Sequence, residues 1–142
     1  MRITTFGALV KLEKQMTKIV ISNTKSGQFM VIVKAGNGET LMWSEEYTTK
    51  QSAKHAIGVL QDKAFCAPVF DLTVGDAPSG YRFEIDGTSD GQFMTRFRAP
   101  NGEIIVWSER YTAKHNAQAC AENVRTNIRS AEVVDLTTSR AA

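Results

Sequence analysis

The chain has 142 residues, of which 42% are hydrophobic and 23% charged, and a net charge of +2. This length fits one domain or two very small ones, and the composition is that of a soluble globular protein. The modest positive charge excludes the strongly basic signature of a dedicated nucleic-acid binder. No apolar run approaches the roughly 20 residues of a membrane-spanning helix. Two cysteines give no disulfide framework, so we expect a cytoplasmic protein with no membrane contact.

The patterned part of the sequence is a duplication. Residues 27–53 and 91–117 share 15 identical amino acids in 27 positions, at a constant offset of 64. A unit of this size buries too little surface to be stable alone, so the two copies are expected to share one core. We assign the chain as an N-terminal extension (1–15), a first repeat (16–73), a linker (74–80), a second repeat (81–137) and a tail (138–142).

Each repeat predicts three strands, a helix and a final strand. The expected strands are 19–23, 28–35 and 39–45 in the first repeat and 81–86, 92–99 and 103–109 in the second, because their residues alternate in polarity. Asn-Gly at 37–38 and 101–102 predicts type I′ hairpin turns. Helical spacing of apolar residues follows, with Thr48 and Thr112 as expected N-caps. Asp-Leu-Thr then ends both repeats, at 71–73 and 135–137.

A longer motif carries a family resemblance. The phrase F-x-x-x-x-K/R-A-x-N-G-E … S-E-x-Y-T-x-K-x-x-A occurs at residues 29–53 and again at 93–117. In this motif, and over about residues 17–137, the chain resembles the YegP-like family of small bacterial and archaeal proteins. The resemblance implies one sheet in which two such units exchange their C-terminal strands, and it implies no established activity. Trp43 and Trp107 depart from the small residues that the family pattern places there.

We therefore predict an α+β fold. Two tandem pseudo-symmetric β-β-β-α-β repeats form a single antiparallel sheet with exchanged C-terminal strands, and two helices cover one face of that sheet. Two-residue Asn-Gly turns would place Ile32 opposite Trp43 and Lys34 opposite Leu41. The helix-facing side then takes Phe29, Val31, Val33, Ala35, Thr40 and Met42, with Phe93, Thr95, Phe97, Ile104 and Val106.

The other side of the predicted sheet, which we call the tryptophan face, is the candidate binding surface. Its residues are Met30, Ile32, Lys34, Leu41, Trp43, Met94, Arg96, Arg98, Ile105 and Trp107. An apolar face without helices on it usually marks a contact surface. A second subunit could cover it, or the N-terminal segment with its apolar residues Phe6, Leu9, Val10 and Leu12. A partner protein, a nucleic acid or a small ligand are the other possible occupants.

Catalytic and metal-binding motifs are missing from the sequence, and we predict no cofactor. His55 and His115 do not occupy equivalent positions in the two repeats and are interpreted as surface residues. Cys120 fits a buried, inert thiol. Glu45 and Glu109 would suit a paired-carboxylate enzyme only if the pseudo-symmetry brought them together.

Two function hypotheses follow from the tryptophan face. The first is a non-enzymatic interaction module that binds protein, including a second copy of itself. The alternative is a nucleic-acid-binding protein in which the tryptophans stack bases while Lys34, Arg96 and Arg98 contact phosphates. Whichever hypothesis holds, the predicted register places Arg96 opposite Trp107, close enough for a cation–π contact across the strands. Separately, Lys50 and Lys114 lie in first helical turns, where a cation is unfavourable, which suggests a role outside the helix.

Overall fold

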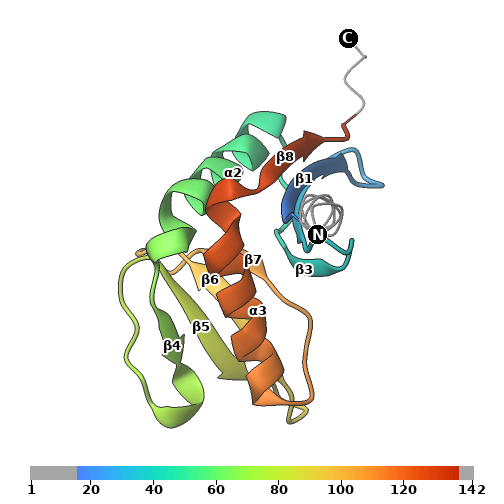
Figure 1. Cartoon of the computed structure of the whole chain (residues 1–142). Helices are drawn as coiled ribbons and strands as arrows, with labels where there is room; N and C mark the ends of the chain where they lie inside the picture. The colour runs from blue at the N-terminus through green and yellow to red at the C-terminus, as the bar shows by residue number, and fades with distance from the viewer. Residues whose placement is uncertain (1–15, 138–142) are drawn as a thin grey trace, which may run out of the picture.

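The computed structural model describes residues 16–137, which form one eight-stranded sheet with two helices on one side (Figure 1). The first repeat contains β1 (Lys18–Asn23), β2 (Phe29–Lys34), β3 (Thr40–Trp43), α2 (Lys50–Lys63), η1 (Ala64–Cys66), β4 (Val69–Asp71) and η2 (Leu72–Val74). The second contains β5 (Arg82–Gly87), β6 (Phe93–Arg98), β7 (Ile104–Trp107), α3 (Lys114–Asn127), η3 (Ile128–Ser130) and β8 (Glu132–Asp135). The predicted order of strands and helices is confirmed. The expected extension and tail, with Phe6, Leu9, Val10 and Leu12, lie outside the described residues.

The strand order is β4-β5-β6-β7-β3-β2-β1-β8, so each repeat gives its last strand to the other repeat. β4 of the first repeat pairs with β5 of the second, and β8 pairs with β1. Both outer pairs are parallel, whereas all inner pairs are antiparallel. The expectation of a purely antiparallel sheet is therefore wrong at its two edges. The outer strands β4 and β8 each follow a helix and not a hairpin turn. Their direction in the sheet is therefore set by where that helix ends.

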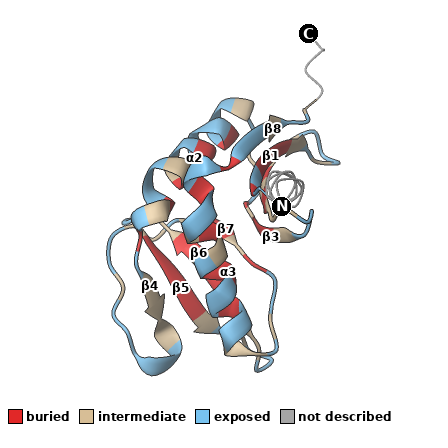
Figure 2. Ribbon diagram, viewed as in Figure 1, coloured by how far each residue is buried: buried red, intermediate tan, exposed pale blue. Residues whose placement is uncertain are grey.

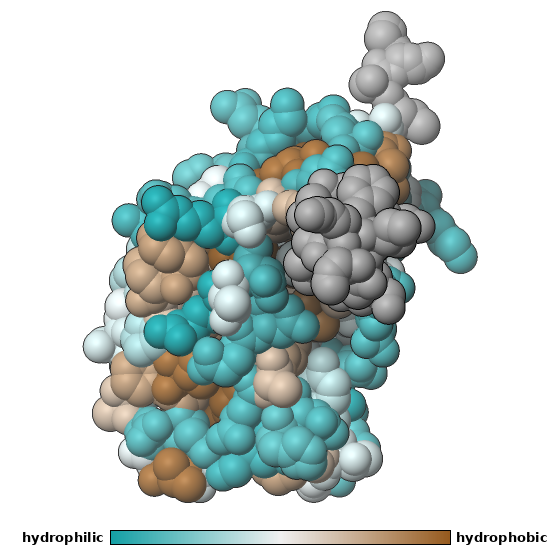
Figure 3. All heavy atoms as spheres, in the orientation of Figure 1, coloured by the Kyte–Doolittle hydropathy of each residue, from teal (hydrophilic) through white to brown (hydrophobic). Residues whose placement is uncertain are grey.

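The core lies between the sheet and the two helices. Its fully buried sheet residues include Ile19, Ile21, Val31, Val33, Met42, Phe83, Ile85, Phe97 and Val106. The helices contribute Ala53, Ile57, Leu60, Ala117, Cys120, Ala121 and Val124, spaced as an amphipathic helix requires. In Figure 2 the buried residues lie on the strands and on the inner sides of the helices. From the helix side, hydrophilic side chains cover much of the outer surface (Figure 3).

The hairpins do not have the predicted type I′ turn. The N–H of Gly38 donates to the carbonyl of Ala35 at 2.9 Å, and the N–H of Ala35 donates to the carbonyl of Glu39 at 2.8 Å. Only Gly38 has a positive φ, of 90°, and Asn37 does not. This is a three-residue loop, in which a type I turn is followed by a glycine bulge. The second repeat has the same turn at residues 99–103.

A β-bulge then corrects the register and moves one residue of each repeat into the core. Lys34 pairs with Thr40, but Ile32 still pairs with Trp43 as predicted, because Leu41 is an extra residue between the two pairs. Leu41 is consequently 8% exposed, and its counterpart Ile105 is 6% exposed, within the core. Their assignment to the tryptophan face is wrong.

Helix α2 begins one residue later than expected, and α3 begins without a side-chain cap. Thr49, not Thr48, is the N-cap of α2, and its hydroxyl accepts a hydrogen bond from the N–H of Ser52. The N-cap position of α3 is Ala113, so Thr112 does not cap that helix. This difference makes the first turn of α3 more dependent on tertiary contacts.

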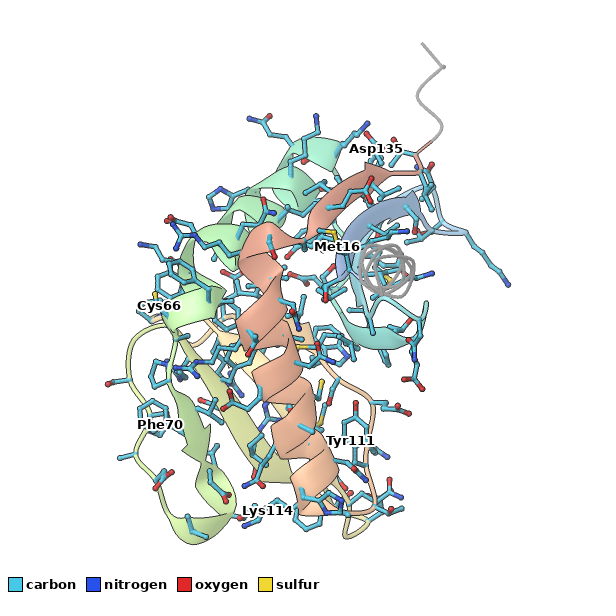
Figure 4. All side chains as sticks on the ribbon, in the orientation of Figure 1. Met16, Cys66, Phe70, Tyr111, Lys114 and Asp135 are labelled. Carbon is cyan, nitrogen blue, oxygen red and sulfur yellow. The ribbon has the colours of Figure 1, made fainter. Side chains whose placement is uncertain are left out.

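Two lysines attach the exchanged strands to the helices. The Nζ atom of Lys50 lies 2.5 Å from Asp135, and that of Lys114 lies 2.8 Å from Asp71. Each pair joins the helix of one repeat to the last strand of the other. The two pairs lie at opposite ends of the molecule, as the labels of Lys114 and Asp135 in Figure 4 show. The hydrogen bond from each lysine holds the pKa of its aspartate below the ordinary value.

A second pair of contacts, also related by the offset of 64, links the helix ends. The Nε2 atom of Gln61 donates to the carbonyl of Ala131 at 3.3 Å, and the Nε atom of Arg125 donates to the carbonyl of Ala67 at 2.7 Å. Both contacts cross from one repeat to the other just before the exchanged strand. The exchange is thus fixed at both ends of each outer strand.

Replacing Lys114 by Met should lower the free energy of unfolding at pH 7, by up to about 1 kcal/mol because the pair is partly exposed. The pKa of Asp71 is lowered in the folded state, so its contribution is present above the unfolded pKa near 4 and disappears as the pH falls through the folded value. The difference between wild type and K114M should therefore shrink in acid. Urea unfolding across this pH range measures it.

The matched control is Lys54→Met, which removes an exposed lysine of α2 that has no ion pair among residues 16–137. It should leave the unfolding midpoint nearly unchanged. Equal effects of K54M and K114M would show that the helix–strand pair adds no stability.

Candidate functional site

The two tryptophans meet at the seam between the repeats. Trp43 of β3 and Trp107 of β7 are direct partners across the antiparallel pair that joins the two halves of the sheet. Residues directly opposite one another project to the same side of a sheet, with Cβ atoms about 5 Å apart. Trp43 is also the partner of Ile32, and Trp107 that of Arg96. Both tryptophans are half-buried and lie at the centre of the side of the sheet that faces away from α2 and α3.

The first repeat and the exchanged strand β8 make one side of this face apolar. We call this surface the apolar half; it consists of Val20, Met30, Ile32, Trp43 and Val134. Val20 lies between Ile32 and Val134 in the register and is only 5% exposed. The other four residues are half-buried. Their side chains form a continuous patch that runs from β8 across β1 and β2 to the seam.

The second repeat makes the other side ionic. This charged half consists of Arg82, Glu84, Asp86, Arg96 and Arg98. The sequence patterns indicated the strand at 81–86 but did not assign its faces, so Arg82, Glu84 and Asp86 were missed. Their signal was present in the alternation Arg-Phe-Glu-Ile-Asp, which places a charged side chain at every second position.

Glu84 is the centre of the charged half. Its carboxylate accepts hydrogen bonds from Arg82 Nε at 2.9 Å and from Arg98 Nε at 2.7 Å, and it is only 2% exposed. Arg96 lies 3.8 Å from the same carboxylate and donates to Asp86 at 2.5 Å. Burial alone would raise the pKa of Glu84, but the hydrogen bonds from the two arginines lower it below its ordinary value. The group therefore stays ionised at the centre of its arginines.

These contacts change the interpretation of the predicted phosphate-binding residues. Arg96 and Arg98 are engaged by carboxylates of their own chain, and Arg98 also donates to the carbonyl of Gly102 at 2.6 Å. Cation–π contacts within residues 16–137 are made by Lys63 and Arg129, so the expected contact of Arg96 with Trp107 is not formed. Met94 lies beside Asp86 in the register.

Lys34 has a different environment from Arg98, its counterpart. Arg98 pairs with Glu84, but the position equivalent to Glu84 in the first repeat is Val20. Lys34 therefore has no carboxylate partner among residues 16–137. Lys34 as a whole is half-buried and lies at the border of the apolar half.

Replacing Glu84 by Val should destabilise the fold by roughly 3 kcal/mol, because two arginines then lose their buried counter-charge. The double change Glu84→Val with Arg98→Met should recover part of this loss, since it removes one of the two arginines that E84V leaves without a counter-charge. Urea unfolding followed by circular dichroism compares the three proteins. Similar free energies of unfolding for wild type and E84V would contradict a stabilising role for this network.

Residues 16–137 contain no group of three or more His, Cys, Asp or Glu side chains placed to hold a metal ion. Neither helix of that part of the chain is long and apolar enough to cross a membrane. The two histidines are exposed, and the buried thiol of Cys120 has a pKa raised to about 11, with burial as the main cause.

Two interleaved repeats that share one sheet and carry both helices on one side define a small tandem-repeat α+β protein. The chain belongs to the family described as a domain of unknown function (DUF1508), whose model matches residues 24–71 and 88–135. The resemblance to YegP-like proteins is thereby confirmed. The family description states no activity.

Relatives and solved structures agree with this assignment. The UPF0339 protein YegP of Escherichia coli K12 is 31% identical over 117 residues, covering 82% of this chain and 94% of that protein. The UPF0339 protein Atu5359 of Agrobacterium fabrum is 44% identical over 59 residues, which is 42% of this chain but 95% of that protein. The solution structure of E. coli yegP, a protein of unknown function, matches with a TM-score of 0.71 at 28% identity over 89% of this chain and 97% of its own.

Proposed function

We propose that this chain is a non-enzymatic interaction module that binds a segment of another protein on the apolar half of the tryptophan face. The observation that carries the proposal is the division of this face into a half whose arginines pair with carboxylates of the same chain and a half of apolar side chains that α2 and α3 do not cover. Aromatic and aliphatic side chains gathered on a sheet face are typical anchors of protein contacts. We place the module in the cytoplasm, since both cysteines are free thiols.

The chemistry of the patch suggests what the partner segment carries. The partner segment places apolar side chains opposite Met30, Ile32 and Trp43. The unpaired ammonium of Lys34 at the border of the patch favours a carboxylate, because an ion pair formed at an edge adds selectivity and register to an apolar contact. The partner segment is therefore apolar with an acidic residue beside its apolar side chains.

Nucleic-acid binding receives less support from the same face. Phosphate contacts by Arg96 or Arg98 would first break their pairs with Glu84 and Asp86. Without its arginines, Glu84 would be a buried carboxylate with no counter-charge, which is strongly unfavourable. Protein binding on the apolar half breaks no ion pair of residues 16–137.

Selection of random peptides displayed on phage against the full chain tests the proposal. The enriched peptides should combine apolar residues with Asp or Glu. Met30→Lys should weaken their binding by about tenfold or more, because it places a charge in the patch. Met94→Lys is the matched control, since Met94 occupies the equivalent position in the charged half and should retain binding. Lys34→Glu should shift the selected peptides from acidic to basic residues.

Peptides that bind wild type and M30K equally would contradict the proposal. A homodimer in native mass spectrometry that M30K dissociates and M94K does not would assign the same surface to a second copy of the chain. Nucleic acid that copurifies and is released by salt would assign the face to the alternative function.

A further inference from the structure

The repeated phrase contains acidic residues that the turns and helix starts do not use. Ser44 has a structural role, since its hydroxyl accepts from the N–H of Val31 and donates to the carbonyl of Glu45. The backbone of Tyr47 is bonded in both directions to Phe29. These contacts explain the serine and the chain path. They involve neither the carboxylate of Glu45 nor the ring of Tyr47.

The fold brings these unused residues together across the repeats. Tyr47 lies within the electrostatic influence of Glu45 from its own repeat and Glu103 from the other. Burial raises the pKa of Tyr47 to about 12, and both glutamates add to the increase. Glu45, which lies between β3 and α2, thus shares Tyr47 with Glu103 of the β6–β7 hairpin, and not with Glu109, the partner that a paired-carboxylate enzyme would have needed. We call Glu45, Tyr47 and Glu103 the first cluster.

The first cluster opens into a cleft between α2 and the hairpin that joins β6 to β7. The cleft has a volume of about 870 Å³, within the range of small-molecule sites. Its lining includes Glu45, Tyr47, His55, Tyr81, Glu103 and Ile105. The wall is thus built by both repeats, and it lies on the helix side of the sheet.

The lining combines negative charge, an aromatic wall and an apolar base. Neither Glu45 nor Glu103 forms an ion pair with a residue of the described part of the chain. Tyr81 is held as a fixed wall, because its ring stacks on Phe97 at 6.2 Å and has Lys63 5.6 Å from its centroid. Ile105, moved to this side of the sheet by the β-bulge, supplies apolar surface.

The equivalent second cluster consists of Glu109, Tyr111 and Glu39, and its surroundings differ. Cys120 replaces Ala56; its thiol donates to the carbonyl of Leu41 at 3.5 Å and helps to raise the pKa of Tyr111. At the offset of 64, Ala119 replaces His55, and Thr17 stands where the second repeat has Tyr81. Figure 4 labels Tyr111 beside the first half of α3. The second cluster therefore has the same two glutamate positions but lacks counterparts of Tyr81 and His55. It provides a control within the same chain for the role of the first cluster.

We propose that the cleft between α2 and the β6–β7 hairpin binds an organic cation, an ammonium or guanidinium group on an apolar stem. Glu45 and Glu103 supply the counter-charge, and Tyr47 supplies the aromatic surface on which such cations are stabilised. The cation belongs either to a free small molecule or to a basic side chain of a peptide. This site goes beyond the interaction module and lies on the opposite side of the sheet, so each can fail without the other.

Nuclear magnetic resonance titration of the full ¹⁵N-labelled chain tests this proposal with two probes. n-Butylguanidinium represents the free cation, and acetyl-Gly-Arg-Gly-amide represents the same group on a peptide. Either probe should shift amide signals of the cleft residues, with the stronger binder identifying the source of the cation. n-Butylurea, which has nearly the same shape and no charge, should bind at least about tenfold more weakly, because it lacks the attraction of the two carboxylates.

Matched variants locate the site. The double change Glu45→Gln with Glu103→Gln should weaken binding about tenfold or more, whereas Glu109→Gln with Glu39→Gln should change it less than about twofold. Dispersed amide spectra of both double variants would establish that each is folded. Equal losses in the two double variants, equal binding of butylurea, or no shifts at the cleft with either probe would overturn the proposal.

Discussion

The exchange of the outer strands is the constraint on which the rest of the structure depends. The repeats meet directly at the centre of the sheet through one partner pair, Trp43 with Trp107, which is a narrow junction for two halves of a domain. The wider connection is made at the edges, where β4 lies on β5 and β8 lies on β1. Each outer strand is also tied to the opposite helix by a lysine–aspartate pair and by a side chain that reaches a backbone carbonyl. Neither repeat has a complete sheet without the other.

This constraint also bears on relatives of different length. The Agrobacterium protein matched over 59 residues is about one repeat long. A single repeat folded as here would lack the partner of its first strand and would leave its last strand unpaired. Open strand edges bind other strands readily. A one-repeat chain could therefore complete this sheet only with a second chain, whereas the tandem chain completes it internally.

The periodic patterns of the sequence are strong enough to predict the fold. They do not predict local irregularities such as β-bulges, or which charged side chains pair. The duplication, the order of elements and the pairing of Ile32 with Trp43 could all be predicted. The predicted pairing of Ile32 with Trp43 is correct because two irregularities compensate. The glycine bulge in the loop shifts the register by one residue, and the β-bulge at Leu41 restores it. Nothing in the alternation signals a bulge between two apolar residues, so Leu41 and Ile105 were placed on the wrong face. Glu84 was missed because partners 14 residues apart, such as Arg98, meet only through strand pairing.

Duplication allowed the two halves of one scaffold to differ where the fold does not require identity. The turns and the buried serines are retained because each copy needs them for its own hairpin, and the lysine–aspartate pairs because they attach the exchanged strands. On the helix-free side, Val20 and Ile32 in one copy correspond to Glu84 and Arg96 in the other. On the helix side, Ala56 in one copy corresponds to Cys120 in the other, which contacts Tyr111. A pseudo-symmetric backbone thus presents one apolar patch and one acidic cleft. In the patch, Val20 and Ile32 themselves differ between the copies. Around the cleft, both copies share the two glutamates and the tyrosine, and only the surrounding residues, such as His55 and Tyr81, differ.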